Sequence, residues 1–318
     1  MQVYHSTEVI PIFNKAVLTI GTFDGVHLGH AKLLDQLIAE AKAINGTAVI
    51  ITFFPHPQRV IGKDTSLLRL LNTQEEKYAL LQKKGIEHIV IVPFDAAFAA
   101  QTATEYVHDF LIKRFKPHTI IIGYDHRFGN NREGDFNLME KEARLSGFKV
   151  KEISEKLLQD VIISSTKIRN ALGSGDVSTA ANYLGYNYCV SGIVVKGRQL
   201  GRTIGYPTAN IEIDDQQKLI PADGVYAVFV KITGWDDPFE GMLNIGNRPT
   251  VNGISRTIEV NIFNFNEDIY DLKLTVIFIG RLRSEIKFDG LDNLKAQLAS
   301  DHLQAQTLLS SYQKKTNT

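Results

Sequence analysis

Residues 16–30 read AVLTIGTFDGVHLGH, and this stretch decides the fold. Its first five residues are apolar or β-branched and predict a buried strand, while the apolar spacing over residues 28–44 predicts the helix that follows. Glycines and histidines fill the turn between them. A strand, a glycine-containing turn and a helix form the repeating unit of open α/β sheets, which bind ligands at this edge. We therefore expect residues 21–30 to lie at a ligand-binding edge.

The same alternation of strand and helix patterns fills the first half of the chain. Short runs of apolar and β-branched residues predict buried strands at residues 47–52, 88–92 and 119–122. Helical patterns lie between and after these runs, at residues 73–83, 103–115 and 137–146. Strands that alternate with helices pair in parallel, so we expect an α/β fold with a doubly wound, Rossmann-like parallel sheet.

The pattern changes after about residue 185. Before it, residues 166–184 form a helical stretch that Gly173-Ser174-Gly175-Asp176 divides in two, because Gly ends helices and Asp begins them. After it, alternating runs separated by turn residues occur at residues 190–196, 224–232, 256–264 and 272–279. These runs predict a small antiparallel β-barrel or sandwich. We place the domains at residues 1–184 and 185–318.

An amphipathic stretch at residues 291–311 follows the predicted strands. Its leucines are spaced to pack on the barrel, although the spacing is imperfect for one straight helix. The leucines concerned are Leu291, Leu294, Leu298, Leu303 and Leu308.

Composition limits the classes of function. The chain has 318 residues, enough for about two domains. Lys plus Arg and Asp plus Glu are both 35, and a net charge of zero argues against a nucleic-acid or membrane-surface partner. The single cysteine, Cys189, excludes an intrachain disulfide and suits the cytoplasm. We also expect neither a membrane helix, which needs about 20 apolar residues, nor a signal peptide.

The turn at residues 21–30 carries the first candidate site. Glycines at a helix N-terminus let a phosphate approach backbone N–H groups, where the helix dipole favours negative charge. His27 and His30 are three residues apart, on one side of the first helical turn, and can reach the same anion. The alternatives are a zinc pair, which needs at least one further ligand, or ordinary helix-capping histidines.

A second phosphate motif is expected at residues 163–169, which read ISSTKIR. Hydroxyls, two cations and a helix terminus in one turn suit phosphate binding. A plain capped helix is the alternative. A serine-acylase reading of Ser164-x-x-Lys167 is disfavoured because neither Ser-Asp-Asn nor Lys-Thr-Gly occurs in the chain.

The two motifs together resemble the FMN adenylyltransferase module of bacterial bifunctional FAD synthetases. His27-Leu28-Gly29-His30 is similar to the His-x-Gly-His signature of the nucleotidylyltransferase superfamily. The resemblance implies that His27, His30 and Arg169 are catalytic and offset the charge of departing pyrophosphate. It further implies a nucleotide-binding set: Gly21, Thr22, Phe23, Gly29, Ser164, Ser165, Thr166 and Lys167.

Two aromatic segments fit the same module. Residues 53–57 (FFPHP) and 123–129 (GYDHRFG) follow predicted strands, where rings can stack on an isoalloxazine and charged groups can bind its polar edge or a phosphate. Taken alone, Phe53 and Phe54 are expected in the core rather than in a flavin site. The resemblance implies flavin contacts by Phe53, His56, Asp125 and Phe128. The family usually has Phe where this chain has His126, so the role of that position stays open.

The second half carries another candidate site. Residues 197–210 read GRQLGRTIGYPTAN, and three glycines four residues apart make either a phosphate-binding loop or a plain hairpin connection. With residues 223–226, 244–250 and 257–263, this segment resembles the riboflavin kinase barrel. The resemblance implies that Gly197, Gly201 and Gly205 cover ATP phosphates and that Arg281 lies near the flavin.

Glu259 is the candidate general base of this half. It lies on an alternating strand, and alternation alone allows its side chain to face a pocket or solvent. The resemblance implies that Glu259 is the catalytic base, and that Thr208 and Asn210 hold Mg²⁺. Two neutral oxygens suit a partly hydrated Mg²⁺ bound mainly by nucleotide phosphates.

The resemblances cover nearly the whole chain and imply two reactions. Riboflavin and ATP would give FMN and ADP in the second half, and FMN and ATP would give FAD and diphosphate in the first, both with Mg²⁺. The alternatives are a non-catalytic flavin or nucleotide sensor and an adenylyltransferase for another phosphorylated acceptor. Oligomeric state, FMN channelling, flavin redox preference and reversibility stay open.

Overall fold

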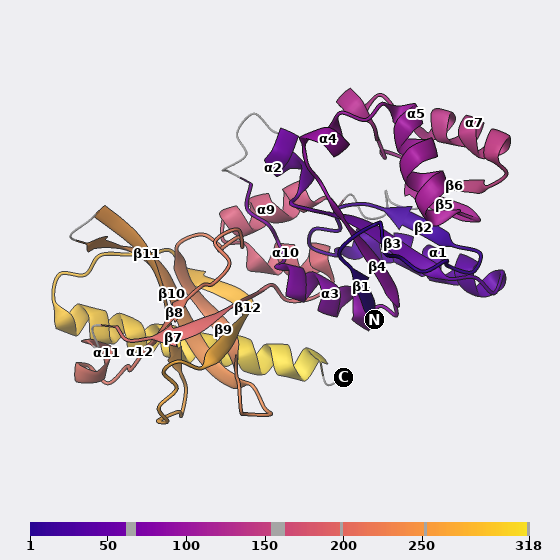
Figure 1. Ribbon diagram of the computed structural model, residues 1–318. Coiled ribbons are helices and arrows are strands. Elements are labelled where there is room, and N and C mark those ends of the chain that lie inside the picture. Colours follow the sequence, from indigo (N-terminus) through magenta and orange to yellow (C-terminus); the bar gives the residue numbers. More distant parts are fainter. Residues whose placement is uncertain (62–67, 154–162, 198–199, 251–252, 317–318) are drawn as a thin grey trace. The chain divides into compact units, whose positions relative to one another are not determined.

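The chain forms two compact units in the computed structural model, Met1–Ser165 and Thr166–Thr318 (Figure 1). The structure describes residues 1–61, 68–153, 163–197, 200–250 and 253–316. Within these ranges, every helix is too short or too polar to cross a membrane. The predicted boundary between residues 184 and 185 stays a prediction.

A six-stranded parallel sheet organises the described part of the first unit. Its order is β1-β4-β3-β2-β5-β6, and successive connections reverse direction between β2 and β5. The strands are β1 (Gln2–Tyr4), β2 (Val17–Ile20), β3 (Ala48–Phe54), β4 (His88–Pro93), β5 (Thr119–Gly123) and β6 (Lys149–Ile153). The predicted doubly wound sheet is therefore confirmed, with β1 and β6 added at its edges.

Helices cover both faces of this sheet because its strands are apolar on both sides. Alternate residues of β4 show this: Ile89 and Ile91 pack in one core cluster, and Val90 and Val92 in the other. The first cluster contains residues of α1 and α3, and the second contains residues of η1 and α7. The helices are α1 (Leu28–Ala43), α2 (Pro57–Ile61), α3 (Gln74–Lys83), α4 (Ala96–Ala99), α5 (Ala103–Glu105), the π-helix η1 (Tyr106–Ile112), α6 (Lys113–Phe115), the 3₁₀-helix η2 (Asn130–Arg132) and α7 (Phe136–Ser146).

The second unit contains a closed antiparallel barrel with strand order β10-β11-β8-β7-β12-β9, which β10 closes by pairing with β9. The barrel predicted from the alternating runs is confirmed. Two helices precede it, on either side of the predicted break at residues 174–176. The elements are α9 (Ser165–Gly173), α10 (Val177–Leu184), β7 (Cys189–Val195), α11 (Leu200–Thr203), β8 (Ala209–Glu212), β9 (Gly224–Ile232), β10 (Phe239–Thr250), β11 (Gly253–Ile262) and β12 (Lys273–Arg283).

One helix, α12 (Leu291–Thr316), lies along the barrel (Figure 1). Its buried contacts come from Ala305 and Leu309, which join Phe229 and Met242 of the barrel in one apolar cluster. The prediction that all five leucines pack on the barrel is wrong: Leu291 and Leu303 are exposed. Ala305, a smaller residue, is fully buried in this cluster.

Candidate active sites

The histidine motif lies where the connections of the parallel sheet reverse direction. The turn at residues 21–27 follows β2, and the turn at residues 124–129 follows its neighbour β5. In open α/β sheets this edge, between strands whose connections leave in opposite directions, forms the ligand-binding crevice. The sheet topology therefore brings together two of the segments that the sequence singled out.

The two histidine rings stack on each other at the start of α1. Their centroids are 3.7 Å apart, with 17° between the ring planes. Nδ1 of His27 accepts the backbone N–H of His30 at 3.3 Å and caps the helix. A neutral His27 consequently carries its proton on Nε2, where it can donate to an anion. Gly29 is needed here because a Cβ would lie 3.1 Å from Cε1 of His27.

Burial lowers the pKa of His30 well below its usual value, and the nearby charges of His27 and Lys77 lower it further. His30 is therefore neutral at neutral pH in the protein without its ligands. Its Nδ1 is buried and has no hydrogen-bond partner among the described residues. His30 is therefore a neutral imidazole, and it can take up a proton when a negatively charged ligand binds beside it.

The backbone of the turn is held by the sheet. The N–H of Gly21 donates to the carbonyl of Ile51 at 3.0 Å, so this amide extends the sheet rather than facing a ligand. Phe23 is buried and has a positive φ of 49°. The carbonyl of Thr22 accepts hydrogen bonds from the hydroxyl of Thr52 and from Nζ of Lys77. The predicted nucleotide contacts of Gly21, Thr22 and Phe23 stay predictions.

The second phosphate motif opens α9. Ser165 Oγ donates to the backbone carbonyl of Asp24 at 2.9 Å, which joins the start of this helix to the histidine turn. Ser164, Thr166 and Lys167 are exposed, and Arg169 is half-buried. Thr166, Lys167 and Arg169 belong to the second unit. Their predicted contacts with nucleotide stay predictions.

The residues predicted to bind flavin have different surroundings. Phe53 is half-buried, and its ring packs edge-on against that of Phe94, with ring centroids 5.5 Å apart. Nδ1 of His56 accepts the backbone N–H of Gln58 at 3.2 Å. Asp125 is exposed, whereas Phe128 is only 5% exposed and stacks on Tyr106 in the core. Phe128 thus makes the contacts of a core residue, and the flavin contacts of all four predicted residues remain untested.

His126 lies where the resemblance leads us to expect phenylalanine. The surroundings of its ring are those of a buried aromatic residue. Its ring stacks on Phe128 with centroids 5.9 Å apart. Burial lowers its pKa to about 4, although the charge of Asp125 opposes the shift. His126 is therefore a neutral aromatic ring at neutral pH.

In the second unit, a polar row crosses three neighbouring barrel strands. Glu259 of β11 pairs directly with Asn210 of β8 on one side and with Asn244 of β10 on the other. Directly opposed residues on antiparallel strands point to the same face. Thr208 Oγ1 donates to Oε2 of Glu259 at 3.4 Å, and Glu259 is 8% exposed. The structure thus brings together the predicted base and both predicted magnesium ligands.

A buried asparagine, Asn261, supports this row. It lies two residues after Glu259, on the same face of β11, and its Nδ2 donates to the carbonyl of Pro207 at 2.7 Å. Pro207 directly precedes Thr208. The sequence analysis did not assign Asn261 a role, although its spacing of two from Glu259 could have identified it.

The glycine segment at residues 197–205 is only partly a loop. Gly197 lies so close to Asn210 that an added Cβ would come 2.1 Å from its Nδ2. Gly201 lies within the short helix α11, and Gly205 has a φ of +84°. Residues 198 and 199 lie outside the described residues. The predicted cover over phosphates stays a prediction.

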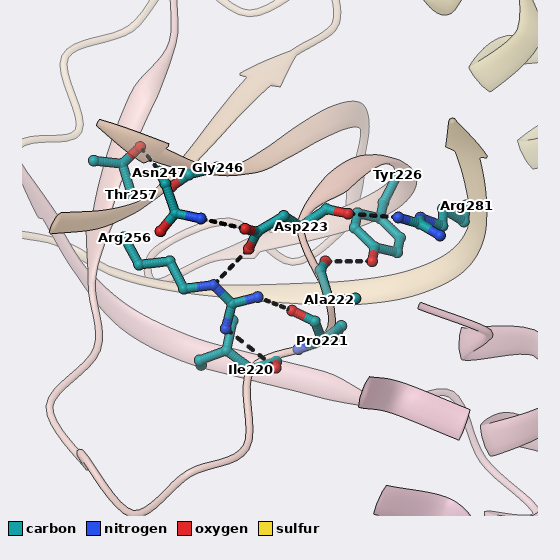
Figure 2. Close-up of polar contacts among 10 residues, drawn as sticks. All are labelled: Ile220, Pro221, Ala222, Asp223, Tyr226, Gly246, Asn247, Arg256, Thr257 and Arg281. Carbon is teal, nitrogen blue, oxygen red and sulfur yellow. Dashed lines mark hydrogen bonds and ion pairs between the residues drawn. The ribbon is translucent and has the colours of Figure 1, made fainter. Parts of the chain in front are cut away.

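Arg281 holds backbone groups together at one end of the barrel (Figure 2). Its guanidinium donates to the carbonyls of Asp223, at 2.6 Å, and of Ser174, at 3.2 Å. The side chain of Asp223 in turn accepts hydrogen bonds from Arg256 and Asn247, as Figure 2 shows. Arg281 therefore connects the end of α9 to the start of β9. Its predicted flavin contact remains untested.

No three His, Cys, Asp or Glu side chains in the described ranges gather as a metal cluster. The oxygens of Thr208 and Asn210 beside Glu259 suit Mg²⁺, which prefers oxygen ligands and retains water or nucleotide phosphates in its shell.

Comparison with known proteins assigns each half to a family. A FAD synthetase family model matches residues 10–167, and a riboflavin kinase family model matches residues 184–309. The bifunctional riboflavin kinase/FMN adenylyltransferase of Escherichia coli strain K12 is 40% identical over 290 residues, covering 91% of each chain. The corresponding Bacillus subtilis strain 168 protein is 36% identical over 306 residues, covering 94% of each.

A solved structure shares the whole architecture. The crystal structure of a Streptococcus pneumoniae protein called macrolide-efflux protein matches with a TM-score of 0.85 and 31% identity. The match covers 96% of this chain and 98% of that one. Both units of the fold therefore occur together in a known structure.

Proposed function

This chain belongs to the bifunctional riboflavin kinase/FMN adenylyltransferase family, and on this premise we propose how its residues divide the two reactions. Its flavokinase domain converts riboflavin and ATP to FMN and ADP. Its FAD synthetase domain converts FMN and ATP to FAD and diphosphate. Riboflavin, FMN and ATP are thus its small-molecule substrates.

In the kinase reaction, Glu259 accepts the proton of the ribityl 5′-hydroxyl as that oxygen attacks the γ-phosphorus of ATP. The observation that carries this proposal is the row formed by Asn210, Glu259 and Asn244, in which Glu259 is the one carboxylate. A carboxylate that lies beside hydroxyl and amide groups is a suitable group to accept the proton of a substrate hydroxyl. The hydroxyl of Thr208 orients Glu259 by donating to Oε2.

Thr208 and Asn210 are the proposed protein ligands of Mg²⁺. When bound, Mg²⁺ neutralises charge on the ATP phosphates. Gly197, Gly201 and Gly205 give the segment beside Asn210 a backbone that can approach those phosphates closely. Arg281 supports the end of the barrel, and we retain its predicted proximity to the flavin.

In the adenylylation reaction, an oxygen of the FMN phosphate attacks the α-phosphorus of ATP, and pyrophosphate leaves. No protein nucleophile is required. His27 donates from Nε2 to the phosphate oxygens, and His30 becomes protonated as negative charge gathers beside it. We further propose that Lys167 and Arg169 bind phosphate, with Ser164, Ser165, Thr166, Gly29 and the backbone of residues 21–23 contacting nucleotide. The proposed flavin contacts are Phe53, His56, Asp125 and Phe128.

The proposed compartment is the cytoplasm. A single cysteine in 318 residues suits a reducing environment. We also propose domains at residues 1–184 and 185–318, and partners limited to small molecules, without nucleic acid or membrane.

Two variants of the full chain separate the proposed sites. Glu259→Gln should lower the kinase rate by about 10²–10⁴-fold, the range typical of a lost general base. FAD formation from supplied FMN should stay near the wild-type rate, which also shows that the variant is folded. Chromatography of flavins after incubation with riboflavin, ATP and Mg²⁺ measures both products. A normal kinase rate in Glu259→Gln would remove this residue from the mechanism.

His30→Ala should have the opposite effect. Loss of one group that stabilises transition-state charge costs about 10²–10³-fold, so FAD formation should fall by that amount while FMN formation continues. His27→Ala tests the other ring in the same assay. A variant that makes FAD at the normal rate would exclude its histidine from the reaction.

A further inference from the structure

A buried lysine lies next to the histidine turn and takes no part in the reactions described above. Lys77 belongs to α3 and is 6% exposed, although lysine is rarely buried unless its charge is paired. Its Nζ donates to the backbone carbonyl of Thr22 at 3.0 Å. The ammonium therefore binds the second residue of the turn directly.

Further buried contacts hold the same turn. The hydroxyl of Thr52, on β3, donates to the same Thr22 carbonyl at 3.3 Å. One carboxylate oxygen of Asp24 accepts the backbone N–H groups of Leu71, at 2.9 Å, and of Asn72, at 3.3 Å. The turn is thus attached by β3, by α3 and by the segment that precedes α3.

The turn needs these contacts because its backbone is strained. Phe23 has a φ of 49° and Val26 a φ of 37°. Positive φ is uncommon in residues other than glycine, and in β-branched valine it is an outlier. Such conformations persist only where the surrounding structure holds them, and they concentrate at functional sites. Lys77 binds directly beside Phe23, the first strained position.

The charge of Lys77 also reaches the site. Burial lowers the pKa of Lys77, and the negative charge of Asp24 opposes that shift. Lys77 is one of the groups that lower the pKa of His30. The ammonium consequently acts on the adenylylation site both through the Thr22 carbonyl and through its charge.

We propose that Lys77 is a positioning residue for adenylylation: its ammonium holds the Thr22 carbonyl, and with it the strained turn that presents His27 and His30 to the ATP phosphates. This inference rests on the proposed role of the two histidines. A positioning role predicts a loss of kcat that exceeds the change in KM, because the substrates still bind while the groups that stabilise the transition state are misplaced.

The first test compares Lys77→Met with Lys83→Met, a matched change of an exposed lysine on the same helix. Methionine keeps most of the apolar stem and removes the ammonium. Because a displacement of about 1 Å can cost about 10²-fold in rate, Lys77→Met should lower kcat for FAD formation from FMN by about that factor. KM for FMN and for ATP should change by less than about threefold. Lys83→Met should match the wild type in each constant.

A second pair of variants separates positioning from folding. Lys77→Met removes a positive charge that interacts with the buried Asp24 carboxylate, and this can destabilise the first unit. In Lys77→Met with Asp24→Asn both charges are gone, while the amide oxygen can still accept from Leu71 and Asn72. This double variant should recover thermal stability and retain the low kcat. Thr52→Val removes the other hydrogen bond to Thr22 without removing a charge, and should lower kcat by less.

The results distinguish a wrong role for Lys77 from a wrong assignment of the histidine site. Near-wild-type kcat in a folded Lys77→Met variant, or in the double variant, would overturn the role of Lys77. His30→Ala in the same assay tests the site itself. If His30→Ala is inactive while the Lys77 variants are active, only the inference about Lys77 fails; if His30→Ala is also active, the proposed histidine site fails with it.

Discussion

The proposed reacting groups of both sites lie among hydrogen-bonding side chains, and the charge of Lys77 also acts on His30. In the kinase site, Thr208, Asn210 and Asn244 lie around Glu259. In the adenylylation site, burial keeps His30 neutral until a ligand brings negative charge. We therefore expect the phosphates and the proposed Mg²⁺ to bring most of the charge with them, while the protein supplies hydrogen bonds in fixed positions. Such preorganised groups stabilise a transition state without rearranging as it forms.

One prediction concerns Asn261, whose hydrogen bond holds the segment that contains Thr208 and Asn210. Asn261→Leu removes the donor to the Pro207 carbonyl, and the loss of such a hydrogen bond costs about 0.5–1.5 kcal/mol. The segment that contains Thr208 and Asn210 should shift, and the kinase kcat/KM for ATP should fall by about 10–10²-fold. FAD formation from FMN should not change. Asn266→Leu, the same change at an exposed residue of this unit, is the control and should leave both rates unchanged.

A second prediction at this scale concerns pH and His126. The unfolded chain binds a proton at His126 below about pH 6.5, whereas the folded chain does so only below about pH 4. Between these values the unfolded state holds more protons, so the free energy of unfolding falls as pH falls, by up to about 3 kcal/mol from this group. His126→Phe should remove this part of the pH dependence. Hydrogen exchange of β5 amides at several pH values measures it.

The control for this variant is His5→Phe, at an exposed position. Its hydrogen exchange should follow the wild type at each pH. His126→Phe should also stabilise the first unit slightly at neutral pH, since Nε2 of His126 is buried without a hydrogen-bond partner in the described ranges. An unchanged pH dependence in His126→Phe would contradict the predicted protonation.

Among the elements, α12 is attached to the barrel by an ion pair whose carboxylate is buried. Asp301 is fully buried and binds Arg283 of β12 through two nitrogens, with distances of 2.7–3.1 Å. Removing one partner of a buried pair is strongly destabilising, so Asp301→Ala should lower the free energy of unfolding of the second unit by about 3 kcal/mol. Leu303→Ala, at a residue 65% exposed on the same helix, should change it by less than about 0.5 kcal/mol. Urea unfolding followed by Trp235 fluorescence compares them, and similar midpoints would contradict the anchoring role.

Sequence periodicity predicted the elements with a regular apolar pattern well and the others poorly. The strand predicted at residues 224–232 is β9. The edge strands β1 and β6 were not predicted: β1 has three residues, and β6 is mostly polar. The strand β10 was also missed because Gly241, Gly246 and Pro249 interrupt its alternation. These segments form strands because they pair with neighbouring strands. A local sequence pattern does not show which strands will be neighbours.

The sequence predicted site residues well where a local motif contains them. It predicted less well the contacts between residues that only the fold brings together. The row of Asn210 and Glu259 joins residues 49 positions apart, and only the register of β8 with β11 places them opposite each other. Lys77 and Asn261 act through backbone carbonyls of distant segments. A carbonyl occurs at each residue, so no sequence pattern identifies which one is bound.

The proposed histidines of adenylylation and the proposed kinase residues belong to different compact units, although Lys167 and Arg169, proposed to bind phosphate in adenylylation, belong to the second unit. His27 and His30 belong to the first compact unit, and Thr208, Asn210 and Glu259 to the second. A substitution that inactivates one centre should therefore leave the other folded and active. Equal numbers of acidic and basic residues give the molecule no net charge to attract FMN or ATP over long distances, so capture depends on local groups.

Mixing two full-length variants, each impaired in one reaction, tests whether the two centres work independently. Glu259→Gln should make little FMN from riboflavin, and His30→Ala should make FMN but little FAD. A mixture with riboflavin, ATP and Mg²⁺ should make FAD after a lag, because FMN released by one variant must reach an intact adenylylation site on the other. The lag should shorten as the concentration of either variant rises, since that transfer occurs through solution. FMN that accumulates without FAD would mean that FMN formed on one molecule cannot enter the site of another, and that the two centres are not independent.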